Sequence, residues 1–399
     1  MRLLWLFILL PLWCQAESAF ELYNESTLSR NPDINGLPDS AEPPDLLLTD
    51  SLYFRYLYQR DVTANGQLQL HYQGGLNAML WHQHGDTDFD TSLLDSKQRY
   101  RIRDLDHTPQ QNLLGIDHLD YRQNLDRLQW YQRFPHADLY LGRQPITLGT
   151  ARFASGTDVI YPTELAALPS DYRTGVDAIR LEIPVGELSV LDSGFVGSRN
   201  SDDNVAFGRY KTNVQAIDWT LTAIAWHDAH IYSLGTEGAL SSFGLWQELA
   251  WLQPSSGRTL LRWSLGFDQS IGDFLVQLEY HYNQPGSQNA GHYLTNTSSD
   301  PFYQRGAINL YGEHYLFASL SWLNGVRSSF ESSLSANLDD GSLMLTPYLT
   351  RSLSENSELT LQVNLPLGDQ PLFTQRQFSM GSEFGSYPTS ITLQLKGYF

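Results

Sequence analysis

The sequence has one cysteine, few basic residues and no long hydrophobic run beyond its first residues. The single cysteine, Cys14, leaves the rest of the chain without a thiol, which excludes disulfides, cysteine metal sites and thiol catalysis there. Lys and Arg number 25 against 44 Asp and Glu, a net charge of −19, so the basic surface that nucleic acid requires is missing. No stretch after residue 16 has the length and apolar character of a transmembrane helix, so any membrane crossing must be made by strands.

Recognisable catalytic and metal-binding patterns are also missing. The eleven histidines are scattered, and no Gly-x-Ser-x-Gly nucleophile turn is present. Asp86, Asp88 and Asp90 alternate as in a calcium loop, but Thr91 stands where that loop needs glycine and Lys97 where it needs a closing carboxylate. These three aspartates are therefore a weak metal candidate. We predict a protein that is not an enzyme and has no cofactor.

The N-terminus has the pattern of a secretory signal. Arg2 is followed by an apolar run over residues 3–13 and then by Cys14-Gln15-Ala16, a small-residue cleavage pattern. A lipoprotein is the alternative use of Cys14, although the bulky Trp13 precedes it. We predict that residues 1–16 are a signal peptide and that the chain is exported.

The rest of the chain is a series of alternating segments with period two. The last of them places apolar side chains on one face and polar ones on the other, and it stops on Phe399. A terminal strand of this kind closes a transmembrane β-barrel. We therefore predict an outer-membrane location, contact with outer-membrane lipid and lipopolysaccharide, and recognition by the barrel-assembly machinery through the strand ending at Phe399.

The segments number seventeen, and the connections between them alternate between short and long. They are expected at 49–60, 66–83, 119–134, 138–149, 175–184, 187–198, 204–213, 215–227, 229–236, 242–252, 258–270, 273–284, 313–323, 326–338, 342–353, 357–366 and 389–399. Long connections fall at about 84–118, 150–174, 285–310 and 368–388, as expected of extracellular loops opposite short periplasmic turns. The fold class is thus all-β, an antiparallel transmembrane barrel.

The strand count and the role of the N-terminal segment are linked. Bacterial barrels usually have an even number of strands, and Phe20, Leu22 and Leu28 suggest a weak strand in 17–30. We expect about 18 strands, with 16 as the fallback if 229–236 belongs to a loop. The domains are then a signal peptide at 1–16, a segment at 17–45 that is a weak strand, a linker or a lumen-crossing plug, and the barrel at 46–399.

One internal run is more specific than the strand pattern. Gly142-Arg143-Gln144-Pro145 leads through Gly149 and Arg152-Phe153 to Thr157-Asp158-Val159-Ile160-Tyr161-Pro162. This run resembles the G-R-Q…G…F…P-x-D…P pattern of proteobacterial porin-like barrels, including relatives of alginate-export channels, over about 125–185. Gly156 and Leu148 depart from it, where a proline and an aromatic residue are expected. The resemblance implies a barrel with a loop that enters the pore.

The loop at 150–174 is too long for a simple hairpin, and loops of that length usually carry a function. Its folding into the lumen would place a group of charges at a constriction, namely Arg143, Arg152, Asp158 and Arg173. The alternative is that Arg143 and Asp158 form an ion pair that fixes the loop to the wall.

The polar faces of the strands predict a hydrated lumen wall with charges of both signs. Its members are Arg55, Arg127, Arg133, Arg180, Glu182, Glu248, Arg262, Asp268, Glu279, Arg327 and Glu331. A basic wall facing an acidic one would set up a transverse field, whereas cross-lumen salt bridges are the alternative. A single β-bulge would exchange the side chains that a strand directs into the lumen with those that it directs outward.

These observations predict a channel for passive diffusion of small hydrophilic solutes, constricted by the 150–174 loop. Deletion of 153–170 should then widen the pore. An export channel for an anionic polysaccharide is one alternative, although it requires a continuous basic lumen. A non-conducting barrel with a structural or adhesive role is the other.

Overall fold

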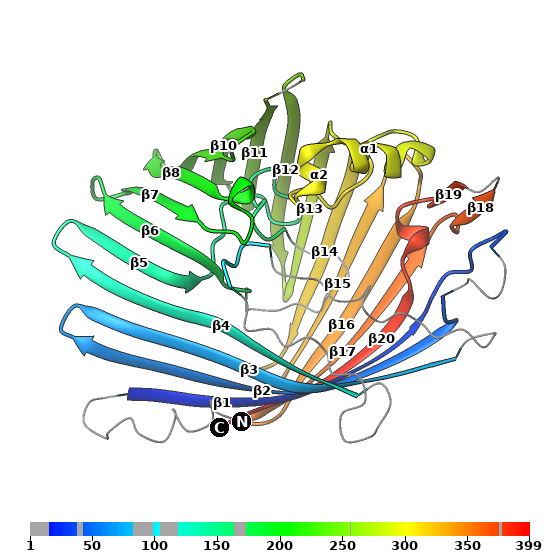
Figure 1. Ribbon diagram of the computed structural model, residues 1–399, viewed down its shortest axis with the longest axis horizontal. Coiled ribbons are helices and arrows are strands. Elements are labelled where there is room, and N and C mark those ends of the chain that lie inside the picture. The colour runs from blue at the N-terminus through cyan, green and yellow to red at the C-terminus, as the bar shows by residue number, and fades with distance from the viewer. Residues whose placement is uncertain are drawn as a thin grey trace.

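The computed structural model describes residues 16–37, 43–82, 99–103, 119–162, 173–255, 257–374 and 377–399. Eighteen antiparallel strands form one closed barrel (Figure 1). They are β1 (Ala16–Arg30), β2 (Leu46–Thr63), β3 (Gly66–His82), β4 (Leu119–Phe134), β5 (Ala137–Gln144), β6 (Val176–Pro184), β7 (Ser189–Val196), β8 (Val205–Val214), β9 (Ile217–Ala225), β10 (Ala229–Leu240), β11 (Phe243–Pro254), β12 (Leu260–Ile271), β13 (Phe274–Asn283), β14 (His314–Asn324), β15 (Ser328–Asn337), β16 (Leu343–Ser354), β17 (Ser357–Leu367) and β20 (Thr389–Tyr398).

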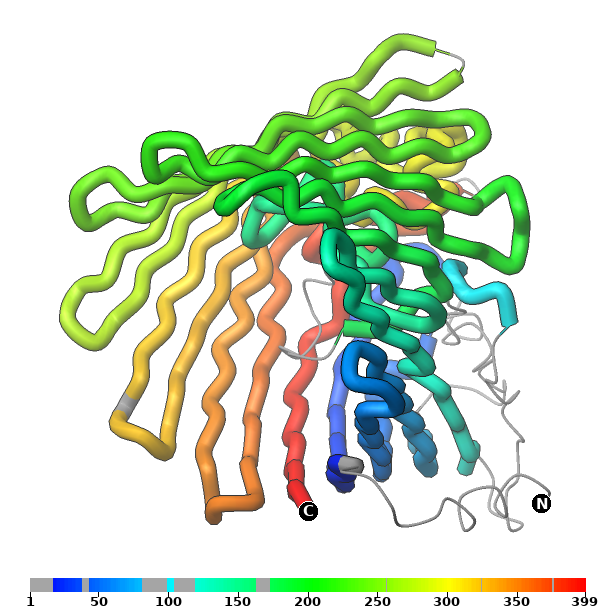
Figure 2. Tube along the Cα trace, turned by 90° about the vertical axis from the view of Figure 1, so that its left-hand side faces the viewer, coloured from blue at the N-terminus to red at the C-terminus, as the bar shows by residue number. Residues whose placement is uncertain are grey.

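The barrel closes because β1 pairs with both β2 and β20. Its register sets Leu28 against Leu48 of β2 and Ile391 of β20, and the red β20 stands beside the dark-blue β1 in Figure 2. The expected count of 18 strands is confirmed. The weak strand over 17–30 supplies the eighteenth, and 229–236 is part of β10 rather than a loop.

The long connections between the wall strands carry the small elements, and Phe302 of one of them is buried in the same apolar cluster as the inner wall. Residues 284–313 contain α1 (Tyr293–Ser299) and α2 (Pro301–Gln304), where Asp300 caps α2 by accepting from the amide of Phe302 at 2.8 Å. The connection after β17 holds the hairpin β18 (Leu372–Thr374) and β19 (Gln377–Ser379). No helix in the described ranges is long and apolar enough to cross a membrane.

Alternation gives the barrel two different surfaces. Outward side chains are apolar and exposed, for example Leu80 at 63%, Ile179 at 56% and Leu221 at 52%. Inward side chains are mostly polar, but the inner wall of β6–β12 also contributes to a buried apolar cluster that includes Val176, Val205, Phe207, Ile224, Ile231 and Leu252. The lumen is therefore not lined by polar groups alone.

Strand β5 ends five residues earlier than the predicted 138–149. Gly142 adopts a φ of +105°, and Pro145 has no N–H to continue the ladder. The chain therefore leaves the wall after Gln144 and turns inward. An added Cβ at Gly142 would lie 2.2 Å from the carbonyl oxygen of Leu128.

Replacement of Gly142 by alanine is expected to destabilise the barrel by roughly 1–3 kcal/mol, because the positive φ and this close approach both disfavour a side chain. The measurement is urea unfolding of the protein in lipid vesicles. Gly186, whose surroundings are open, is the control for an alanine substitution. Equal effects at the two positions would contradict the argument.

Candidate functional site

The segment after β5 folds into the barrel and packs against its inner wall. Ile146, Leu148, Val159 and Ile160 are all at most 5% exposed and belong to the buried cluster shared with β6–β12. On the wall, Gly235 and Ala250 leave room for this segment, since the ideal Cβ of Gly235 would lie 2.4 Å from Oγ1 of Thr150. We call residues 145–162 the inserted segment.

Glu248 of β11 binds the inserted segment through both carboxylate oxygens. Oε2 accepts from the amides of Thr150 at 2.5 Å and Ala151 at 3.0 Å, and Oε1 accepts from the amide of Thr157 at 2.9 Å. Three hydroxyl groups also donate to Glu248, those of Thr150, Ser155 and Thr157. The carboxylate is buried, so these bonds replace the water that it would otherwise require.

Glu279 of β13 binds the next residues of the inserted segment. Its oxygens accept from the amides of Arg152 at 2.9 Å, Phe153 at 3.3 Å and Ala154 at 2.8 Å. The indole of Trp246 donates to Glu279 at 2.7 Å, and Arg209 donates to the Thr147 carbonyl at 2.6 Å. Wall side chains therefore satisfy much of the polar backbone of a segment that makes no ladder with any strand.

Gly156 stands where the pattern expected from the sequence has a proline. The ideal Cβ of Gly156 would lie 2.6 Å from Cβ of Ala250, so the backbone of the inserted segment rests directly on β11. A proline ring at this position would meet the same wall atom. The departure is consistent with a closer contact between segment and wall.

The charged side chain of Arg152 spans the gap between the inserted segment and the wall. Its guanidinium donates to Asp268 and, at 3.0 Å, to Glu237, and it lies 4.1 Å from the ring centroid of Trp246. About a third of the Arg152 side chain is exposed. Arg152 is therefore a charge of the inserted segment that remains accessible in the lumen.

Asp158 and Arg173 form an ion pair at 2.7 Å. Burial raises the pKa of the Asp158 carboxyl, and the nearby Arg173 opposes that rise. With Arg152 and Arg262 these two residues line a pocket of about 60 Å³ against the inserted segment. Three of the four expected constriction residues thus come together, whereas Arg143 lies elsewhere.

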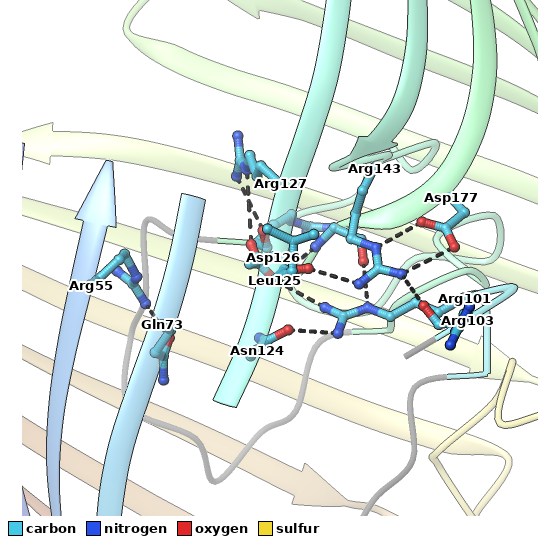
Figure 3. Close-up of polar contacts among 12 residues, drawn as sticks. Arg55, Gln73, Arg101, Arg103, Asn124, Leu125, Asp126, Arg127, Arg143 and Asp177 are labelled. Atoms are coloured by element: carbon cyan, nitrogen blue, oxygen red, sulfur yellow. Dashed lines mark hydrogen bonds and ion pairs between the residues drawn. The ribbon is translucent and has the colours of Figure 1, made fainter. Parts of the chain in front are cut away.

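Arg143 pairs with Asp177 and not with Asp158 (Figure 3). Its Nε and Nη2 donate to the Asp177 carboxylate at 2.7 and 3.1 Å, and it also donates to the carbonyls of Leu125 and Arg103. The alternative in which Arg143 pairs with Asp158 is wrong, because Arg143 lies opposite Asp177 in the β5–β6 register. Arg143 joins strands and does not face the inserted segment.

Arg101, which the sequence did not single out, is buried beside this network. It donates to the carbonyl of Gly175 at 3.0 Å, to Asn124 at 2.6 Å and to Asp126 at 3.1 Å. Asp126 is the extra residue of a β-bulge, since Leu125 and Arg127 pair with consecutive residues of β3. No sequence signal marks Arg101, because its partners are 23 and more residues away.

Several of the expected lumen charges are paired with neighbours on the same wall. Arg55 pairs with Glu21 at 3.0 Å, and Arg180 pairs with Asp192 at 2.8 Å and also with Glu182. Arg127 donates to the Arg173 carbonyl at 3.2 Å. Local pairing, rather than two walls of opposite sign, is the arrangement found among these residues.

The remaining expected wall charges have different positions. Arg262 is buried, with its Nη2 3.3 Å from Nε2 of His281. Arg133 is exposed near Asp138. Glu331 faces inward, opposite Ser321 and Tyr348 of the neighbouring strands. Arg327 does not lie on the wall: it is in the exposed turn before β15, because that strand starts at Ser328 instead of the predicted 326.

The weak metal candidate falls outside the described residues, which include none of Asp86, Asp88 and Asp90. Among the residues that are described, no group of three or more His, Cys, Asp or Glu side chains could hold a metal ion.

Comparison with known proteins identifies the fold. No family model matches the chain, and no curated protein matches its sequence. Solved structures do match: OccK7 (OpdD) of Pseudomonas aeruginosa has a TM-score of 0.55, 10% identity and coverage of 96% of this chain and 99% of its own. A BenF-like porin from Pseudomonas fluorescens Pf-5 has a TM-score of 0.56, 10% identity and coverage of 96% and 99%. OccAB1 of Acinetobacter baumannii has a TM-score of 0.52, 10% identity and coverage of 96% of this chain and 96% of its own. At this identity the likeness shows a shared 18-stranded barrel fold.

Proposed function

We propose that the chain is an outer-membrane channel through which small hydrophilic solutes diffuse passively, and that the inserted segment narrows its lumen. The observation that carries the proposal is a segment held inside a closed barrel by Glu248 and Glu279. Such a segment narrows the lumen while the outer wall remains apolar enough to contact lipid. The proposed interactions are with lipid and lipopolysaccharide outside, a small polar solute inside and the assembly machinery at the strand ending in Phe399.

The likeness to porins of known structure supports this function at the level of fold. Several of the matching structures are named as porins or as members of the Occ series. The finer relation to alginate-export barrels rests on the sequence run from Gly142 to Pro162 alone. An export channel for an anionic polymer is less well supported, because the arginines at positions 55, 152 and 180 each have an acidic partner.

A non-conducting barrel is the second candidate, and the buried interior favours it. A second apolar cluster, which includes Ala154, Leu310, Phe317 and Phe384, joins the inserted segment to two long connections. If these contacts fill the cross-section, the barrel has no through-path. Conductance separates the two candidates.

Single-channel conductance of the refolded protein in a planar bilayer tests the proposal. Stable openings are expected, with a size that reflects a narrowed lumen. Silence from a protein that is correctly folded would favour the non-conducting barrel. Strong anion selectivity in a salt gradient would instead favour polyanion export.

Replacement of Arg152 by alanine is expected to shift the reversal potential toward cation preference. The change removes a partly exposed positive charge and leaves Asp268 and Glu237 without their partner. The reversal potential under a salt gradient measures the shift. Arg327→Ala is the matched control, since it removes the same charge from an exposed turn. Identical shifts in the two variants would contradict a role for Arg152 in the lumen.

A further inference from the structure

The outer face of β1 and β2 has a polar cluster where lipid contact is expected. Asn24, Ser26 and Asp50 share this face, since their inward neighbours, such as Tyr23 and Ser29, are buried in the lumen wall. Nδ2 of Asn24 donates to Oδ1 of Asp50 at 3.1 Å, and the hydroxyl of Ser26 donates to the same oxygen. The cluster therefore concentrates three polar side chains on one spot of the outer surface.

Exposed leucines lie on both sides of this cluster along the strands. Toward one end of the barrel are Leu22 (41% exposed) and Leu52 (43%), and toward the other are Leu28 (46%) and Leu48 (37%). Asp50 thus lies within the apolar band and not at its edge. An ionisable group in hydrocarbon is costly unless another protein group covers it.

Asp50 has unused capacity to accept hydrogen bonds. Both donors reach Oδ1, while Oδ2 has no hydrogen bond or ion pair within the part of the chain that the structure describes. A carboxylate can accept about four bonds through its two oxygens. In the register β3 places the small Ala78 beside Asp50, so an approaching group meets little steric obstruction there.

The same outer face presents an unused donor two strands away. Gln123 of β4 faces outward, and its Oε1 accepts from the hydroxyl of Tyr72 at 2.9 Å. Its Nε2 has no partner among the residues described, although an amide nitrogen carries two hydrogens. The surface formed by β1–β4 therefore contains both an acceptor without a donor and a donor without an acceptor.

We propose that the outer face of β1–β4 is the contact surface between copies of this chain in the membrane, with Asp50 and Gln123 as its polar contacts. A second copy supplies both missing partners, because each copy carries the complementary group. Symmetric homo-oligomers are the common form of association, and polar groups in a membrane interface join the contacting surfaces. The inference rests on the proposed membrane location, but not on whether the barrel conducts.

Cysteine cross-linking tests this surface in the full chain. With Cys14 replaced by serine the sequence has no other thiol. A Leu76→Cys variant places a thiol between Asp50 and Gln123 on β3. A Leu221→Cys variant places one on the outer face of β9, six strands away. We expect copper-phenanthroline treatment of outer membranes to give a disulfide-linked dimer for Leu76→Cys and only monomer for Leu221→Cys.

Second-site variants then identify the polar contacts. Asp50→Leu and Gln123→Leu, each added to Leu76→Cys, are expected to lower the dimer fraction roughly three-fold per lost hydrogen bond. Heat-modifiable gel migration shows whether each barrel is folded. A role of Asp50 confined to its own barrel would change this migration and leave the dimer fraction of the folded protein unchanged.

Each remaining outcome overturns a stated part of the proposal. Equal dimer formation at Leu76→Cys and Leu221→Cys would indicate random collision. An adduct whose mass is not a multiple of the chain would indicate a different partner instead of a second copy. Absence of cross-linking in barrels that still conduct would overturn the proposed contact between copies and leave the channel function intact. Cross-linked dimers of a barrel that does not conduct would support the contact surface and overturn the channel function.

Discussion

Replacement of Glu248 by alanine is expected to release the inserted segment and increase the conductance of the barrel. The substitution leaves the amides of Thr150, Ala151 and Thr157 without their acceptor. Each buried group left unpaired costs about 1–3 kcal/mol, so the segment no longer gains enough from the wall to remain in place. Single-channel conductance in a planar bilayer measures the effect.

Two further variants sharpen this prediction. Adding Glu279→Ala should raise the conductance more than either single change, because both carboxylates hold one continuous segment and their effects are coupled. Glu331→Ala, which removes another inward carboxylate without touching the inserted segment, should leave the pore width unchanged. Unaltered conductance of a folded Glu248→Ala barrel would mean that the segment does not limit flow.

The stability of the protein is expected to fall as the pH rises from about 4.5 to about 7, because of Glu383. This residue lies in the connection between β17 and β20, and it accepts from the hydroxyl of Tyr315 and from Asn337 at 2.7 Å. Burial raises the pKa of the Glu383 carboxyl from 4.5 to about 7. In this window the folded state binds more protons than the unfolded state, so a lower pH favours folding.

The size of the effect follows from the shift in pKa and is on the order of 3 kcal/mol. The measurement is the free energy of unfolding in urea at pH 5 and pH 8. Glu383→Gln should remove most of the difference because glutamine does not titrate, whereas Glu331→Gln should leave it. A wild-type stability that does not change with pH would show that Glu383 ionises normally.

The strand pattern could be predicted because it depends on neighbours in the sequence. Alternation over two residues and the polar turns placed the ladder strands within a few residues of their observed ends. Even the weak strand at 17–30 was detectable from Phe20, Leu22 and Leu28. Boundaries failed where a backbone feature intervened, as after Gln144, where Pro145 has no N–H to continue the ladder and β5 ends early.

The contacts of the site could be predicted only in part. Alternation identified Glu248 and Glu279 as inward side chains, but not that they bind a segment about 100 residues away. The partner of Arg143 depends on the β5–β6 register beyond the kink, and the bulge at Asp126 is visible only once β3 and β4 are paired. Such contacts are set by closure of the barrel, which local sequence does not encode.

The pairing of β1 with β20 has a consequence for how the molecule forms. Thr27 and Thr392 lie 2.9 Å apart across this seam although 365 positions separate them in the chain, so the contact has a very large loop-closure entropy. Until the seam closes, the sheet has two free edges whose N–H and C=O groups can pair with any other strand. Closure of this seam pairs both free edges and so removes the surface to which another strand could add.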